Sequence, residues 1–123
     1  MSTSSTSSEL VQSAAQALYQ KKGMNILAID LRGLSTMADF FLIAEGTVDR
    51  HVQALCFEVI HQLQPLRGKP NQIEGEQSGD WIAMDYGDLV IHLFTPSMRR
   101  HYQLEQLWSL GKLVQLSFEE SSS

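Results

Sequence analysis

The chain has 123 residues, which is enough for one domain and too few for two ordinary ones. With 9 Lys and Arg against 14 Asp and Glu, its formal net charge is -5, which argues against broad, sequence-blind binding to nucleic acid. An acidic chain suits a basic protein partner better, because opposite charges steer the two proteins together.

The N-terminal residues, the single cysteine and the length of the apolar runs predict where the protein works. Cys56 has no second cysteine to pair with, which fits a reducing compartment. No apolar run approaches the ~20 residues that cross a bilayer. Residues 1–8 are rich in Ser and Thr and lack the basic and apolar regions of a secretory signal. We therefore expect a disordered tail over residues 1–8 on a cytoplasmic protein without a membrane contact.

The first elements along the chain are a helix and two strands. Residues 8–23 carry apolar side chains at helical spacing and end in Lys-Lys-Gly, a typical helix stop. Residues 25–32 and 38–46 are short and almost continuously apolar. That pattern is typical of central strands covered on both faces of a sheet.

A second helix is predicted from Thr47, whose hydroxyl can cap its first turn, to Pro65, which should end it. One buried stripe runs along this helix, made of Val48, Val52, Leu55, Val59 and Leu63. The following residues 66–80 contain Gly and Pro throughout, so they predict a long connection, with room for a short edge strand at 72–74.

The last elements are a hairpin and a third helix. Two strands flank a tight turn at Tyr86-Gly87 or Gly87-Asp88, and Thr95-Pro96 is a strong helix start. The sequence thus predicts a single α/β domain over residues 9–110, with a mixed β-sheet, flanking helices and the order α-β-β-α-β-β-β-α. Residues 111–123 are expected to form a variable C-terminal tail.

The hairpin has two different faces, because alternate residues of a strand point to opposite sides. One face is wholly aliphatic and should lie against helices: Ile82, Met84, Leu89, Ile91 and Leu93. The other face is mixed: Trp81, Ala83, Asp85, Val90, His92 and Phe94. Aromatic side chains among small neighbours are typical of protein interfaces, although an ordinary solvent-facing side with a sealed Trp fits the pattern equally well.

Metal and covalent chemistry find little support in the sequence. His51 and His61 are ten positions apart on one helix, too far to bind one ion, and the sequence has no His-x-x-x-His motif and no pair of cysteines. Cys56 lies beside an apolar stripe, where a cysteine usually acts as a small hydrophobic residue. We therefore expect no metal, no cofactor and no catalytic residue.

Nucleotidyl transfer is the enzymatic alternative, and RNA binding is another. Gly46-Thr47 opens a helix, as a phosphate-anchoring turn would. Two-metal chemistry also needs two carboxylates on one strand face, and Asp80, Asp85 and Asp88 lack the required spacing of two. The basic and aromatic residues of 98–108 could touch RNA, but they are too few to form a binding patch by themselves.

The stretch "DWIAMDYGDLVIHLF" (80–94), followed by "RRHYQLEQLW" (99–108), closely resembles the ribosome silencing factors, or Iojap-like proteins. "ADFFLIAEGTVDRHVQAL" (38–55) resembles the upstream block of the same family. The resemblance covers residues 9 to 108. Departures from the family pattern, such as Gln103 and Gln106, alter the charges of the last helix.

The resemblance implies a nucleotidyltransferase-like fold without transferase activity. It implies a translational repressor that binds the large ribosomal subunit through its fourteenth ribosomal protein. Binding there would sterically block the small subunit and damp translation in starvation or stationary phase. Organellar relatives suggest an alternative role in large-subunit assembly. We expect little or no direct RNA contact, and an exposed aromatic face could also form a homodimer in the free protein.

The resemblance also implies which residues contact the ribosomal protein. They are Trp81, Asp85, Tyr86, His92, Phe94, Arg99 and Tyr102, with Thr47, Arg50 and His51 nearby.

Overall fold

The computed structural model describes residues 6–34, 38–102 and 112–118. Its elements are α1 (Ser7–Gln20), β1 (Met24–Asp30), β2 (Phe40–Glu45), α2 (Asp49–Arg67), β3 (Gln72–Glu74), β4 (Trp81–Asp85), β5 (Leu89–Phe94), α3 (Pro96–Tyr102) and β6 (Lys112–Leu113). The predicted order of helices and strands is confirmed through α3, and β6 is an additional strand.

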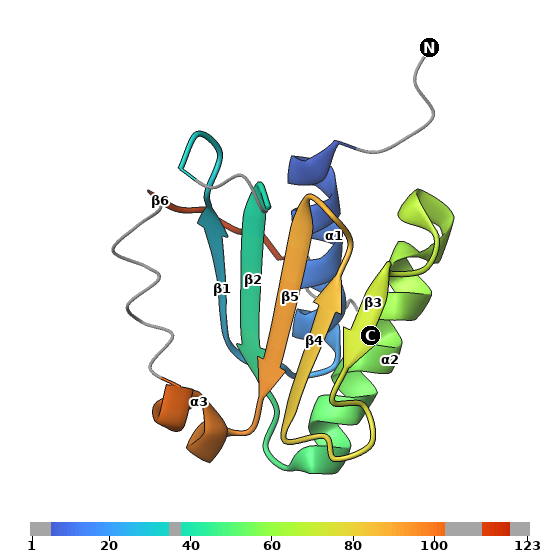
Figure 1. Cartoon of the computed structure of the whole chain (residues 1–123), viewed down its shortest axis with the longest axis vertical. Coiled ribbons are helices and arrows are strands. Elements are labelled where there is room, and N and C mark those ends of the chain that lie inside the picture. The colour runs from blue at the N-terminus through green and yellow to red at the C-terminus, as the bar shows by residue number, and fades with distance from the viewer. Residues whose placement is uncertain (1–5, 35–37, 103–111, 119–123) are drawn as a thin grey trace.

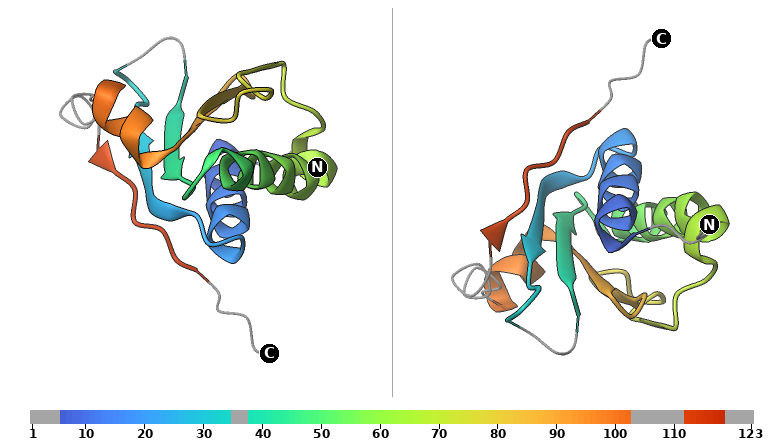
Figure 2. Two further views of the ribbon diagram at one scale, coloured as in Figure 1. Left: turned by 90° about the horizontal axis from the view of Figure 1, so that it is seen from below. Right: turned by 90° about the horizontal axis from the view of Figure 1, so that it is seen from above.

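The strands form one mixed sheet in the order β3-β4-β5-β2-β1-β6 (Figure 1). β2 and β5 are parallel, and every other neighbouring pair is antiparallel. This confirms the predicted α/β domain with a mixed sheet. Both long helices, α1 and α2, lie on the same side of the sheet (Figure 2), so the molecule has two layers over most of its area.

The main hydrophobic core lies between these two helices and the sheet. The aliphatic hairpin face predicted from strand alternation is fully buried there: Ile82, Met84, Leu89, Ile91 and Leu93. Four of the five residues in the predicted stripe of α2 are also buried, but Val48 is 55% exposed. Val48 precedes the first turn as the N-cap residue in extended conformation, so it does not follow the helical periodicity.

The two strands predicted to be covered on both faces differ in their burial. β2 is one of the two central strands, with Phe40 and all residues from Leu42 to Glu45 buried. β1 is buried only at Ala28 and Ile29, and its Asn25 is exposed. The reason is its position, since its outer neighbour β6 pairs only with Ile29 and Asp30.

The predicted ends of α2 were wrong at both termini. The N-cap is Val48 instead of Thr47 and makes no side-chain capping bond. Pro65 lies inside the helix, which continues to Arg67. A proline removes a single backbone donor there, and the added turn is tied down because Arg67 forms a two-pronged ion pair with Asp88, at 2.7 and 3.1 Å.

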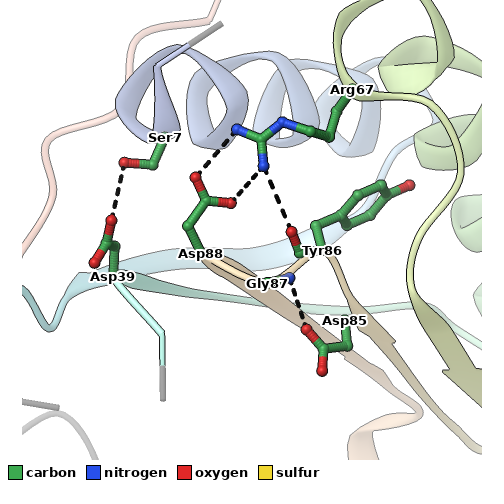
Figure 3. A network of polar contacts seen from close by, with 7 residues as sticks. All are labelled: Ser7, Asp39, Arg67, Asp85, Tyr86, Gly87 and Asp88. Carbon is green, nitrogen blue, oxygen red and sulfur yellow. Dashed lines mark hydrogen bonds and ion pairs between the residues drawn. The ribbon is translucent and has the colours of Figure 1, made fainter. Parts of the chain in front are cut away.

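The hairpin turns at Gly87-Asp88, the second of the two predicted positions. Tyr86 donates its backbone N–H to the carbonyl of Leu89 at 2.9 Å, and Gly87 has a φ of 92°, which favours glycine. Figure 3 shows how the turn is held: Asp85 Oδ1 accepts the N–H of Gly87 at 2.7 Å, while the carboxylate of Asp88 binds Arg67.

Part of the segment expected to be a variable tail packs on the domain. Val114 donates its N–H to the carbonyl of Ala28 at 2.9 Å, just beyond the pairing of β6 with β1. Phe118 stacks on Tyr19 of α1, with ring centroids 4.5 Å apart. The folded unit therefore includes residues 112–118.

Candidate docking surface

The second face of the sheet is largely free of helices where β3, β4, β5 and the start of β2 meet. Strand pairing places the following side chains together on it: Phe41, Gln72, Glu74, Trp81, Ala83, Asp85, Val90 and His92. All of them are half-buried or exposed. We call this set the open face. In Figure 1, α1 and α2 lie behind the sheet on its opposite side.

A cluster of aromatic rings, which we call the aromatic group, lies at one end of the open face and consists of Phe41, Trp81, His92 and the buried Phe94. The indole Nε1–H of Trp81 donates to Nδ1 of His92 at 3.2 Å. The Trp81 ring also stacks on Phe94, with centroids 5.5 Å apart, and Phe41 meets His92 edge-on at 5.5 Å. These contacts hold the indole in one orientation, so little side-chain entropy remains to be lost when a partner binds.

The hydrogen bond from Trp81 fixes the state of His92. Because Nδ1 accepts a hydrogen, the hydrogen of the neutral ring lies on Nε2. Burial lowers the pKa of His92 to about 4, since desolvation disfavours the imidazolium. At neutral pH, His92 is therefore an uncharged side chain with an N–H donor on Nε2.

Next to the aromatic group lies a hollow of about 300 Å³. It is lined by Phe41, Gln72, Glu74, Ala83, Met84, Asp85, Val90 and His92. Its polar rim consists of two carboxylates and one amide, and Gln72 donates to Glu74 at 2.9 Å. Its walls are otherwise apolar or aromatic, so it combines hydrophobic contact area with negative charge.

Three of the predicted contact residues are interior. Tyr86 is 4% exposed, Phe94 is 0% exposed and Arg99 is 5% exposed. Burial raises the pKa of Tyr86 to about 12, and its hydroxyl makes no hydrogen bond to a described residue. Their side chains offer almost no surface to a partner in this structure. They support the open face from beneath or beside it.

Arg99 ties α3 to the end of the sheet. Its Nη1 donates to Glu45 Oε2 at 2.8 Å and to the backbone carbonyl of Asn25 at 2.9 Å. Asn25 donates to the same carboxylate oxygen at 3.1 Å. Met98, one residue earlier in α3, packs against the small buried cluster that contains Phe94. The buried ion pair thus fixes the helix that borders the aromatic group.

Thr47, Arg50 and His51 lie at the start of α2, beyond the end of β2 and off the open face. His51 bridges two elements: its Nδ1 accepts the N–H of Thr47 at 2.8 Å, and its Nε2 lies 2.8 Å from the carbonyl of Lys21. The backbone N–H of Thr47 is therefore already bonded to a side chain of the same helix. Thr47 and Arg50 are exposed, and the side chain of Tyr102 lies outside the described residues.

The three carboxylates weighed for nucleotidyl transfer, which lack the spacing that two-metal chemistry needs, have structural partners. Asp88 binds Arg67, Asp80 accepts a hydrogen bond from Ser78 at 2.9 Å, and Asp85 caps the hairpin turn. Within the described ranges, no group of three His, Cys, Asp or Glu side chains could hold a metal ion. Burial raises the pKa of Cys56 to about 11, as expected of a small core residue.

Three residues of the open face were missed by the sequence analysis. Phe41, Gln72 and Glu74 join it because β2 pairs with β5 and β3 pairs with β4. Strand alternation assigns residues to faces within a hairpin, but it does not reveal which distant strands lie beside it.

Comparison with known proteins places the chain in a family. The family model described as "Ribosomal silencing factor during starvation" matches residues 4–123. The ribosomal silencing factor RsfS of Bacillus subtilis is 37% identical over 109 residues, which cover 89% of this chain and 92% of that protein. A mouse protein named "Mitochondrial assembly of ribosomal large subunit protein 1" is 33% identical, over 83% of this chain and 48% of that protein.

A solved structure agrees with these sequence matches. A crystal structure from Bacillus halodurans is similar with a TM-score of 0.78 and 35% sequence identity, covering 89% of this chain and 99% of that one. In the part of the chain that the structure describes, no helix is long and apolar enough to cross a membrane. The fold, the family match and the identity over most of its length show that this chain belongs to the RsfS family of ribosomal silencing factors.

Proposed function

We propose that this protein represses translation by binding the large ribosomal subunit through its fourteenth ribosomal protein. Bound there, it blocks the small subunit sterically and damps translation in starvation or stationary phase. It acts as a docking module without catalysis. The observation that carries the proposal is the open face, where an oriented Trp81 lies beside an acidic hollow in a member of the RsfS family.

The chemistry of the open face favours a basic protein over naked RNA. Tryptophan is over-represented among the few residues that carry most of the binding energy of a protein interface. Trp81 is half-buried and hydrogen-bonded to His92. Glu74 and Asp85 would repel phosphate groups but attract basic side chains. The net charge of -5 adds to the same preference.

Cosedimentation with purified large subunits at moderate salt tests this proposal. The protein should migrate with free large subunits and be absent from joined ribosomes, and adding it before the small subunit should reduce joining. A protein that stays at the top of the gradient, or that binds joined ribosomes equally well, would refute the proposal.

A role in large-subunit assembly is the second candidate, because the name of the mouse relative describes mitochondrial large-subunit assembly. In that case, cells lacking the protein should accumulate incomplete large subunits during rapid growth. A defect confined to starvation would favour repression. A homodimer through the open face would compete with ribosome binding, so the molar mass of the free protein should be measured in the same buffer.

A further inference from the structure

The charged side chains that line the hollow on the open face are all negative. Glu74 and Asp85 stand on its rim, and none of the described residues lining it is Lys or Arg. Asp85 uses Oδ1 for the N–H of Gly87, and Glu74 uses Oε1 for the amide of Gln72. Neither carboxylate forms an ion pair with a described residue, so each keeps a second oxygen available to a ligand.

The two carboxylates are placed so that one cation can approach both. Glu74 pairs with Ala83 and Gln72 pairs with Asp85, so the acids are diagonal neighbours on one face of β3 and β4. Diagonal neighbours in an antiparallel pair are about 7–8 Å apart, and long side chains close that distance. A cation between them would gain two charge-assisted contacts.

The rest of the hollow suits an aliphatic stem or a flat cationic group. Phe41, Ala83 and Val90 provide apolar walls, and the ring of His92 is neutral. A basic side chain can bury its methylene groups on such walls while its charged end stays at the rim. A guanidinium can also stack on an aromatic ring such as that of Phe41.

We propose that this hollow receives one basic side chain, an arginine or a lysine, from the protein to which the open face docks. The inference rests on the proposed function, since the partner is the ribosomal protein named there. Trp81 supplies contact area at one end of the open face, and Glu74 and Asp85 select for positive charge at the other.

The test measures binding of the full chain to purified large subunits for Glu74→Gln, Asp85→Asn and the double variant. Asn keeps an oxygen for the N–H of Gly87, so the turn should persist, and urea unfolding checks that it does. Glu76→Gln is the matched control, because Glu76 is exposed, carries the same charge and lines a different hollow beside α2.

The double variant should raise Kd by about tenfold or more, the loss expected for charge-assisted contacts, and should weaken the salt dependence of binding. The Glu76→Gln control should remain within about twofold of the wild type. Equal losses of affinity in the double variant and the control would show that binding depends on the net charge of the protein and not on the hollow. That result would overturn the inference. Unchanged binding of the double variant would overturn it too, whereas a wild type that does not bind refutes the proposed function itself.

Discussion

At the scale of single residues, the open face depends on the orientation of Trp81. The indole is held between the Nδ1 atom of His92 and the ring of Phe94, and it remains half-buried instead of sealed. A side chain already held in its bound orientation contributes contact area with a small entropy cost. Trp81 is therefore the residue of the open face on which binding should depend most.

Trp81→Ala should weaken binding to large subunits by about 2 kcal/mol, as truncation of an aromatic hot-spot residue does. Phe57→Ala is the control, because Phe57 is 73% exposed on α2, a helix that covers the other face of the sheet. Titration with labelled protein gives both affinities. Equal affinity of a folded Trp81→Ala variant and the wild type would show that the partner docks elsewhere.

His92 should make stability depend on pH. Its pKa is about 4 in the folded protein and near 6.5 when the chain unfolds, so the unfolded state binds the proton first as the pH falls. The stability that neutral His92 contributes to the folded protein is fully present above pH 6.5. It declines as the pH falls toward 4 and then levels off. Urea unfolding between pH 4 and 7 should show a shallower decline for His92→Gln. Parallel profiles for the two proteins would contradict this.

At the scale of elements, a buried ion pair attaches α3 to the sheet. It is a short helix, Pro96–Tyr102, and its Arg99 reaches across to Glu45 at the end of β2 and to Asn25 in β1. Both charged side chains are at most 10% exposed. The ion pair therefore fixes the position of α3 relative to the sheet, next to the aromatic group.

Arg99→Ala should cost about 3 kcal/mol of stability, because it leaves the buried carboxylate of Glu45 without its cation. Urea unfolding measures the loss. The double variant Glu45→Leu with Arg99→Met should recover much of it, since no unpaired charge remains. A single variant as stable as the wild type would show that the pair contributes little.

At the scale of the whole molecule, the chain closes on itself through its C-terminal segment. Residues 112–118 add β6 to the outer edge of β1 and then pass over α1, where Leu116 and Phe118 pack against the core. The segment thus covers the end of one sheet edge, at Ala28 to Asp30, and one side of the helical layer. Edges left uncovered invite pairing with other chains.

Truncation after Gly111 should destabilise the protein by about 2 kcal/mol or more, the cost of exposing several apolar side chains and losing the edge pairing. Truncation after Phe118 is the matched control, and it should leave the urea midpoint unchanged. If both truncated chains unfold at the same urea concentration as the full chain, the packing of residues 112–118 adds no stability.

What the sequence determined by itself follows from short-range rules. Strand alternation in the hairpin put Trp81 and His92 on one face and Ile82 on the other, and the register confirms this. Helical spacing located the buried stripe of α2, and the order of elements up to α3 was correct. These features depend on neighbours within a few residues, so composition and period are enough to predict them.

Only the tertiary structure decided which of these residues reach the surface. In the sequence, nothing distinguishes Tyr86 and Phe94 from aromatic residues that contact a partner. In the structure, Tyr86 faces the helices and Phe94 lies in the interior beside α3. Pro65 stays inside a helix whose end is anchored by Asp88, 21 positions beyond Arg67. Pairing between distant strands brings Phe41 and Glu74 to the hollow. Burial and long-range pairing depend on the whole arrangement of layers, which no local pattern contains.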